Sequence, residues 1–399
     1  MPQKIHIQKV ITPTERNRGE RLLNISFVLW GTGRTGGTHV LFEVANRLSD
    51  YGNEVTIVSL GGVNHNWFHF HGKVKFIYPE VGNFPTLKIR GVRYSLAEVF
   101  GFLFNRYSRT FHIDRIETLS RSIPEDSDVI FATNCFTAFS TYRSKARAKA
   151  IFYYIQHYEP LFFSDSYNYM KARETYYLPL RWIVNSTWAN NTLEREIGRK
   201  GQVIIPGVDS SIFYPRKVDK PGNEKVIVAL GKSNPIKGLN YLFEALKKVK
   251  EKIGEVKLVL YGNEPFLKYK SPVKTEYVVR PTDSELAIIY SSGDVIVTPS
   301  LYESSPLPPL EAMACGCPVV TTQYGVEDYC FDGVNAAVVL PEDPNSLSDA
   351  IIRVLSDQEF RNKLIRNGLS TAHNLTWDST ARRVENIVKS LDLDILPKF

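Results

Sequence analysis

Short apolar runs alternate with amphipathic stretches along most of the chain. Runs of about 4–8 apolar residues predict buried strands, and apolar residues spaced three and four apart predict helices. In the first half we expect strands at 25–30, 54–60, 129–133, 150–156, 181–185 and 203–205. A helix is predicted over 38–51, where Gly52 ends it, and another follows Ser186, a suitable N-cap, as far as Ile197.

The same alternation restarts after a break in the middle of the chain. The break is Pro206–Asp209 followed by a Pro- and Lys-rich stretch over 215–225, which is typical of an interdomain linker. Strands are then expected at 226–230, 256–261, 277–280 and 295–298, with a last one at 318–322, and helices at 238–252, 284–291 and the C-terminus.

This order predicts an α/β protein with two parallel, doubly wound, Rossmann-like domains, each with helices on both faces of its sheet. The expected domains are 1–206, on the acceptor side, and 207–377, with a C-terminal helix in 378–399 that crosses back to the first domain. Parallel sheets of this kind bind ligands at the carboxyl ends of their strands. A ligand site is therefore expected in a cleft between the two sheets.

Composition fits two domains without membrane spans. The chain has 399 residues, 43% of them apolar and 23% charged, enough for two buried cores. No apolar run reaches the roughly 18 residues of a membrane span, and the start has no apolar signal core, so a cytoplasmic location is expected. The four cysteines (Cys135, Cys315, Cys317, Cys330) lack disulfide or zinc spacing and are expected to be small buried residues.

Charge is concentrated in the first half of the chain. Residues 1–200 contain 26 Lys and Arg against 17 Asp and Glu, a net charge of +9. The whole chain has a net charge of +7, so the remainder is slightly negative, at −2. A basic half suggests an anionic partner such as a phosphorylated lipid or a membrane surface, or else only a basic soluble surface.

A glycine-rich turn, Gly31–Gly37, follows the first predicted strand and opens a helix. Its G-x-G-x-x-G spacing matches a dinucleotide fingerprint, but the second strand ends in Val58–Gly61 without the acid that would hold a ribose. Three interpretations remain: NAD or FAD binding, a loop at Gly36 and Gly37 that faces phosphate or acceptor in the cleft, and a structural turn.

Two glutamates eight residues apart, Glu303 and Glu311, flank a loop-to-helix transition just after the strand at 295–298. Carboxylates there can accept hydrogen bonds from sugar or ribose hydroxyls, and the helix N-terminus between them favours phosphate. The alternative is two solvated glutamates at a helix start. Lys232 and Lys237 flank Ser233–Ile236 after an earlier strand, a spacing that suits phosphate more than two unrelated surface charges.

The stretch from Glu303 to Val320 closely resembles the E-x7-E signature of the retaining, metal-independent GT-B glycosyltransferases of family 4, the "glycosyl transferases group 1". The resemblance covers most of the second half and touches the first more loosely, at Gly36–Gly37, Gln156–His157, Ser186 and Pro206–Asp209. It implies the GT-B fold, a nucleoside-diphosphate sugar as substrate, no cofactor and no metal. The Asp-x-Asp at Asp392–Asp394 lies in the C-terminal tail and is expected to be surface.

The resemblance also implies roles for individual residues. Glu311 would bind the ribose hydroxyls, and Glu303 would face the transferred sugar. Lys232 and Lys237 would neutralise the diphosphate. The implied catalytic residues are Glu303, His157 and Lys237, and the implied donor-binding residues are Lys232, Lys237, Arg280, Glu303, Ser305, Leu307 and Glu311. His157 would lie beside the donor sugar and Arg280 with its neighbours would border the base.

The sequence departs from the family pattern in two places. Lys232 stands where many relatives have Arg, which keeps the charge but loses the bidentate fork. Ser305–Pro306 stands where many have Phe-Gly, and Pro306 has no N–H to offer a donor sugar.

These features predict a retaining transferase that moves a hexose-type sugar to a glycan or lipid-linked acceptor. The basic, aromatic segment 88–121 suits docking on a membrane to reach such an acceptor, although its aromatic residues could equally form core. No nucleic-acid-binding module accompanies the charge. The rival hypotheses are a catalytically silent nucleotide-sugar-binding subunit, a sugar-nucleotide epimerase or phosphorylase of the same fold, and a dehydrogenase. The sugar, base, acceptor, linkage and oligomeric state stay open.

Overall fold

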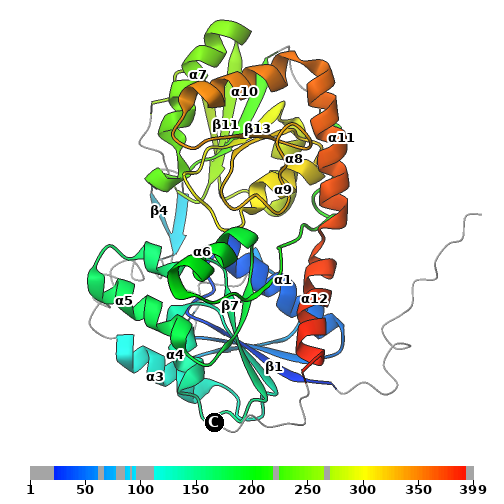
Figure 1. Ribbon diagram of the computed structural model, residues 1–399. Helices are drawn as coiled ribbons and strands as arrows, with labels where there is room; N and C mark the ends of the chain where they lie inside the picture. Colours follow the sequence, from blue (N-terminus) through cyan, green and yellow to red (C-terminus); the bar gives the residue numbers. More distant parts are fainter. Residues whose placement is uncertain are drawn as a thin grey trace, which may run out of the picture.

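The computed structural model describes residues 22–61, 67–77, 86–89, 92–95, 112–218, 224–264 and 270–391. These residues form two parallel sheets, one in each half of the chain, that lie one above the other in Figure 1. A separate antiparallel hairpin is formed by β4 (Thr86–Ile89) and β5 (Val92–Ser95). No helix within the described ranges is long and apolar enough to cross a membrane.

The first sheet has seven strands in the order β3-β2-β1-β6-β7-β8-β9. Its strands are β1 (Asn24–Leu29), β2 (Glu54–Ser59), β3 (Lys73–Phe76), β6 (Val129–Ala132), β7 (Ala150–Ile155), β8 (Arg181–Val184) and β9 (Gln202–Val203). Its connections contain α1 (Gly36–Asp50), α3 (His112–Ser122), α4 (Cys135–Tyr142), η4 (Glu159–Phe162), α5 (Ser166–Glu174), η5 (Thr175–Tyr177) and α6 (Thr187–Ile197). The strand order reverses between β1 and β6, which is where such sheets bind ligands.

The second sheet has six strands in the order β12-β11-β10-β13-β14-β15. Its strands are β10 (Lys225–Leu230), β11 (Val256–Gly262), β12 (Lys274–Val279), β13 (Val295–Thr298), β14 (Val319–Thr322) and β15 (Ala337–Val339). The other elements of this half are η6 (Pro235–Lys237), α7 (Leu239–Ile253), α8 (Asp283–Ser292), α9 (Leu307–Ala314), α10 (Pro344–Ser356), α11 (Gln358–Asn374) and α12 (Trp377–Lys389). Here the order reverses between β10 and β13.

Helices cover both faces of each sheet. Successive residues of a strand point to opposite faces, so neighbouring residues of a central strand pack against different helices. On β1, Phe27 packs in the cluster that contains α1 and α12, whereas its neighbour Val28 packs with Leu119 of α3. On β10, Ile227 packs with α7 and α10, and Val228 packs with α8 and α9. Apolar runs without strict alternation are therefore what these central strands require.

The predicted strands and helices are present, with ends shifted by one to three residues. Ser186 caps α6 as predicted, since its side chain accepts a hydrogen bond from the N–H of Ala189. The strand at 318–322 is not the last one, because the three residues of β15 extend the sheet beyond it. A strand of three residues has too short an apolar pattern to be recognised. The four cysteines are buried, and none of them forms a disulfide.

The chain crosses between the two halves at two adjacent points. After β9 it runs from the first half into the second, and after α11 it returns, so that α12 packs against α1 (Figure 1). Val208 N donates to Leu375 O at 2.9 Å, and Gly207 lies against the backbone of Thr376. The first part of the segment predicted as a linker, residues 206–208, is thus packed, and Val208 is buried.

Replacing Gly207 by alanine is expected to lower the free energy of unfolding by about 3 kcal/mol. A Cβ at Gly207 would lie 2.1 Å from the carbonyl carbon of Thr376, so one of the two crossings must move. Urea unfolding measures the effect. Gly33→Ala is the matched control, because a Cβ at Gly33 meets no atom within 4 Å. Equal stabilities of the two variants would contradict the packing described here.

Candidate active site

A cavity of about 780 Å³ lies between the two sheets. From the first half it is lined by residues that follow the carboxyl ends of β1, β6, β7 and β8, including Trp30, Asn134, His157 and Asn185. From the second half it is lined by residues that follow β10, β11 and β13. The cavity therefore occupies the cleft that the parallel topology predicts, at the strand-order reversals of both sheets.

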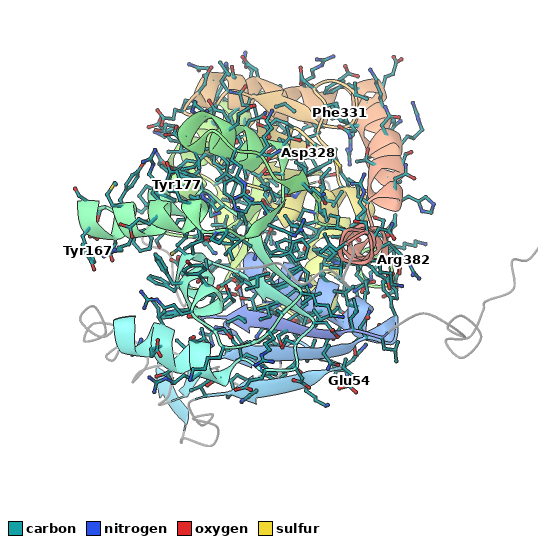
Figure 2. All side chains as sticks on the ribbon, turned by 60° about the horizontal axis from the view of Figure 1, so that its bottom comes forward. Glu54, Tyr167, Tyr177, Asp328, Phe331 and Arg382 are labelled. Carbon is teal, nitrogen blue, oxygen red and sulfur yellow. The ribbon has the colours of Figure 1, made fainter. Side chains whose placement is uncertain are left out.

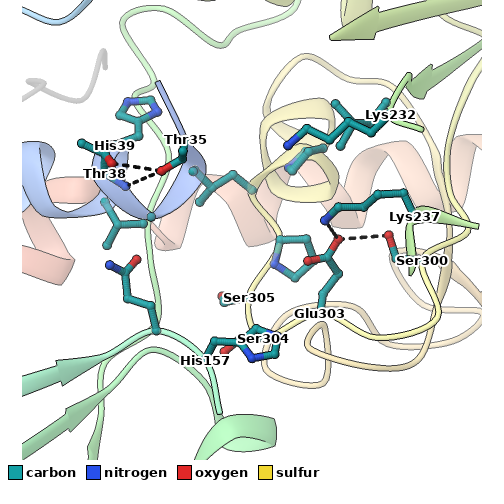
Figure 3. A pocket seen from close by; sticks show the side chains of 18 of the residues that line it. Thr35, Thr38, His39, His157, Lys232, Lys237, Ser300, Glu303, Ser304 and Ser305 are labelled. Atoms are coloured by element: carbon teal, nitrogen blue, oxygen red, sulfur yellow. Dashed lines mark hydrogen bonds and ion pairs between the residues drawn. The ribbon is translucent and has the colours of Figure 1, made fainter. Parts of the chain in front are cut away.

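Lys237 and Glu303 form an ion pair on the wall of the second half (Figure 3). Ser300 Oγ donates to the same oxygen, Oε1 of Glu303, at 3.0 Å. Both side chains are about one fifth exposed, so the pair faces the cavity rather than bulk solvent. Lys237 keeps two further N–H donors for a ligand, and Glu303 keeps a second oxygen.

The turn that carries Lys237 is fixed by a close backbone contact. Gly238 has φ +67°, and a Cβ there would lie 1.9 Å from Pro299 O, so only glycine fits. Leu301 N donates to Ile236 O at 2.7 Å. The loop after β10 and the loop after β13 are therefore joined, which holds Lys237 beside Glu303.

Lys232 lies above this pair, on the same wall of the cavity (Figure 3). Burial lowers its pKa, and the positive charge of Lys237 lowers it further. Among the described residues, no carboxylate forms an ion pair with Lys232. The positive charges of Lys232 and Lys237 repel each other. An anionic ligand bound beside them would stabilise the charged form of both side chains.

Glu311 also lines the cavity and is buried on α9. Tyr290 OH donates to its Oε2 at 3.1 Å, and Tyr261 OH lies 2.7 Å from Tyr290 OH. Burial raises the pKa of Glu311 to about 7, since a charged carboxylate loses its hydration there. The carboxylate still has acceptor capacity for hydroxyl groups that enter the cavity.

The first half of the chain brings two basic groups to Glu311. The charges of His39 and Arg34 both oppose the rise of its pKa. Burial lowers the pKa of His39, but its hydrogen bond to Glu43 and that residue's charge outweigh burial, so the pKa is raised overall. Arg34 also spans the cleft: its Nη2 donates to Pro281 O at 2.6 Å and to Asp283 Oδ1 at 3.1 Å. The part of the cavity around Glu311 is thus formed by residues of both domains.

His157 reaches the cavity from the end of β7, on the first half (Figure 3). Its ring lies 5.6 Å from that of Tyr302, which precedes Glu303, and its Nδ1 lies 3.2 Å from Tyr158 O. Burial lowers the pKa of His157, which favours the neutral ring. If Nδ1 donates to the Tyr158 carbonyl, Nε2 remains as an acceptor for a hydroxyl group.

Gly36 and Gly37 begin α1 and line the cavity, with Gly37 against the side-chain amide of Gln156. Ser305 and Leu307 also line it, at the start of α9. This helix N-terminus is a poorer phosphate site than expected, because residues 306, 308 and 309 are proline. Of residues 306–309 only Leu307 retains a backbone N–H, so this helix N-terminus offers few donors to an anion.

Arg280 is the one predicted donor-binding residue that the structure does not place in the cavity wall. Its φ is +52° and its side chain is exposed. This backbone turn directs the neighbouring Pro281 and Asp283 to the cavity instead. Arg280 itself therefore does not line this cavity, whereas its neighbours do, and its role in donor binding stays a prediction.

Two sequence features lie mainly outside the described residues. They are most of the basic, aromatic segment 88–121 and the Asp392–Asp394 motif. Among the residues that are described, no group of three or more His, Cys, Asp or Glu side chains could hold a metal ion.

Sequence reasoning missed Arg34, His39 and Asp283 as site residues. Arg34 stands within the glycine-rich turn, and a cation between glycines at a helix start is a signal that could have been used. His39 falls in the predicted α1 and resembles any helical histidine. Asp283 contacts Arg34, which is 249 residues away in sequence, so no local pattern indicates this contact.

Two facing parallel sheets with a cavity between their carboxyl ends define the GT-B fold, and solved structures share it. The chain is similar to HepE of Anabaena in complex with UDP-glucose, with a TM-score of 0.71 over 92% of this chain and 100% of that one at 17% identity. It is also similar to sucrose-phosphate synthase of Thermosynechococcus elongatus, with a TM-score of 0.70 over 94% of this chain, 100% of that chain and 17% identity.

Residues 210–371 match the family model "Glycosyl transferases group 1". An uncharacterised glycosyltransferase of Methanocaldococcus jannaschii is 31% identical over 45% of this chain and 49% of its own length. The MMP α-(1→4)-mannosyltransferase of Mycolicibacterium hassiacum is 30% identical over 53% of this chain and 54% of its own length. The chain therefore has the GT-B fold, and residues 210–371 are similar to the glycosyl transferases group 1, as its sequence predicts. It spans about half the length of the curated relatives it matches.

Proposed function

We propose that this protein is a retaining, metal-independent glycosyltransferase. It transfers a hexose-type sugar from a nucleoside-diphosphate sugar to a hydroxyl group of a glycan or of a lipid-linked acceptor. The observation that carries the proposal is the presence of Lys232, Lys237, Glu303 and Glu311 on one wall of the interdomain cavity.

The arrangement suggests how the donor lies. Glu311, at one end of the wall, accepts hydrogen bonds from the ribose hydroxyls. The diphosphate then reaches Lys232 and Lys237, and the sugar lies between Glu303 and His157, which approach each other from the two domains. Arg34 and Asp283 bridge the cleft at the nucleotide end, so the closed domains surround the donor.

The reaction breaks the bond between the anomeric carbon and the β-phosphate oxygen and forms a bond from that carbon to the acceptor oxygen. Negative charge grows on the diphosphate as it leaves, and the two lysines stabilise that charge where it develops. The acceptor hydroxyl attacks from the face that the phosphate leaves, and its proton passes to the departing phosphate. No residue forms a covalent intermediate; Glu303 holds a sugar hydroxyl and favours positive charge at the anomeric carbon.

The relatives support a nucleotide-sugar donor. HepE of Anabaena was solved with UDP-glucose, and the catalytic domain of starch synthase IV from Arabidopsis thaliana was solved with ADP and acarbose. The matched curated relatives include a mannosyltransferase and D-inositol 3-phosphate glycosyltransferases. Their different bases, sugars and acceptors leave all three open for this chain.

Incubation with radiolabelled UDP- and GDP-hexoses, with and without acceptor, is expected to show transfer or slow donor hydrolysis. The anomeric configuration of the product, measured by proton NMR, is expected to match that of the donor. An inverted product would contradict the retaining mechanism. Nucleotide binding in calorimetry without any donor cleavage would instead identify a silent binding subunit, and conversion without acceptor would identify an epimerase.

A thermal-shift screen against UDP, GDP and ADP identifies the base. A nucleotide that binds only the folded state is expected to stabilise it by about 2.7 kcal/mol at 100 times its Kd. Absence of any stabilisation by all three nucleotides, together with absence of cleavage, would contradict the proposed donor site.

A further inference from the structure

Large apolar side chains are exposed together around α5. Of the twelve such exposed side chains among the described residues, five fall within residues 161–177. We call this group the α5 surface; it consists of Leu161, Phe162, Tyr167, Met170 and Tyr177. Figure 2 shows Tyr167 at the outer edge of the molecule, away from Phe331 of the other domain. A local concentration of this kind marks an interaction surface rather than scattered exposure.

Cations accompany the aromatic rings of the α5 surface. Lys171 Nζ lies 6.0 Å from the centre of the Tyr167 ring, and the Arg173 guanidinium lies 5.8 Å from that of Tyr177. Arg143, at the end of α4, is near enough for its charge to act on Lys171. Aromatic rings with a polar end, combined with basic side chains, suit the interface between lipid headgroups and acyl chains. The net charge of +9 over residues 1–200 favours an anionic surface as well.

The α5 surface is continuous with the candidate active site. Phe162 belongs to the α5 surface and also lines the main cavity, where its ring lies 4.5 Å from that of His157. A second hollow of about 260 Å³, beside Tyr169 and Met170, shares Phe163 with the main cavity. Phe162 and Phe163 therefore connect the exposed surface with the residue expected beside the donor sugar.

We infer that the α5 surface docks on a lipid bilayer with anionic headgroups and places the mouth of the cavity at the level of those headgroups. The purpose of this docking rests on the proposed function: an acceptor hydroxyl on a lipid could enter beside Phe162 while its acyl chains stay in the bilayer. The patch also carries Asp165 and Glu174, and Glu174 forms an ion pair with Lys171 at 2.8 Å. Arg143, Lys171 and Arg173 still leave a net positive charge, so an anionic bilayer fits better than a second copy of the chain with the same charge.

Vesicle flotation of the full chain tests the inference. We expect binding to vesicles of equal parts phosphatidylcholine and phosphatidylglycerol, at least tenfold weaker binding to phosphatidylcholine alone, and at least fivefold weakening in 0.5 M salt. The double variant Tyr167→Ser/Met170→Ser is expected to lose at least tenfold in binding. The matched control is Phe331→Ser/Val334→Ser, which removes two exposed apolar side chains from the other domain and is expected to bind as the wild type does.

A second variant keeps the test independent of folding defects. Arg143→Ser/Lys171→Ser removes only exposed charge and is expected to reduce binding to the anionic vesicles by at least threefold, with an unchanged melting temperature. Equal vesicle binding by the wild type and Tyr167→Ser/Met170→Ser would overturn the inference. The inference would also be overturned if the wild type did not bind vesicles but sedimented as a dimer, and if Tyr167→Ser/Met170→Ser sedimented as a monomer.

Failure of the docking is distinguishable from failure of the proposed function. Donor hydrolysis in solution does not require a membrane, so a wild type that hydrolyses donor but ignores vesicles refutes docking alone. A wild type that binds anionic vesicles but cleaves no nucleotide sugar refutes the proposed function and leaves the docking surface intact.

Discussion

Lys237→Ala is expected to lower kcat for the labelled nucleotide sugar by about 10²–10³-fold, with a smaller effect on KM. Lys237 is the cation that the turn at Gly238 holds beside Glu303, on the cavity wall that also carries Lys232. The charge on the diphosphate grows only as the glycosidic bond breaks. An interaction that strengthens with that charge therefore lowers the barrier more than it tightens donor binding.

A matched control comes from the helix that follows this turn. Lys248 on α7 forms an ion pair with Asp349 on the surface, and Lys248→Ala is expected to leave kcat unchanged. Because Lys237→Ala also leaves Glu303 without its cation, Glu303→Gln/Lys237→Ala should be compared with the single variant. If Lys237→Ala kept kcat within threefold of the wild type, the proposed position of the leaving group would be refuted.

Glu311→Gln is expected to weaken nucleotide binding by about 10²-fold, because hydrogen bonds to a charged acceptor contribute about 1.5–3 kcal/mol each. Binding by the wild type should depend on pH, since burial raises the pKa of Glu311 to about 7. Only the ionised carboxylate accepts from both ribose hydroxyls. The Kd is therefore expected to rise about tenfold for each pH unit below 7 and to level off above pH 8, whereas in Glu311→Gln this dependence should disappear.

The same substitution is expected to stabilise the folded protein at pH 8. A carboxyl whose pKa rises from 4.5 to about 7 on folding makes the folded state bind more protons between those values. Stability from this group therefore falls as pH rises through that window, and by pH 8 the cost is about 3 kcal/mol. Glutamine keeps an acceptor for Tyr290 OH without the charge. Unfolding in urea at pH 5 and pH 8 measures the difference, which should be small at the lower pH.

Glu385 provides the control for both effects of Glu311→Gln. It is a buried glutamate on α12 that forms ion pairs with Arg382 and Lys389, outside the cavity. Glu385→Gln is expected to lose stability at pH 8 and to keep the nucleotide Kd. If Glu311→Gln bound nucleotide as tightly as the wild type at pH 8, Glu311 would not contact the ribose.

The sequence predicts the fold well because the pattern that defines a buried parallel strand is local. A segment of six residues, such as β10, is long enough for a strand to be recognised. The alternation of strands and helices starts again after Pro206, and this is enough to separate two sheets. Glu303 and Glu311 could be placed at one edge because Glu303 lies in the loop after β13 and Glu311 lies on α9, the helix that follows this loop. The three residues of β15 have no such signal.

The contacts across the cleft could not be predicted from the sequence. Arg34, His39 and Asp283 acquire their role through the way the domains face each other, which no local pattern encodes. The direction of a single side chain can also depend on one backbone angle, as Arg280 shows with its positive φ. Motif spacing predicts the loop in which such a residue lies, but it does not predict whether the side chain faces the cavity or the solvent.

The two chain crossings, at Gly207 and Thr376, are adjacent, so a rotation of one domain against the other would bend the backbone at one place only. Such a rotation moves most those parts of the cleft that lie farthest from this place, and domain closure of this kind is a usual way to surround a substrate. Donor access then requires the Arg34 contacts with Pro281 and Asp283 to open. A nucleotide sugar that restores them on binding would link its own capture to closure of the domains.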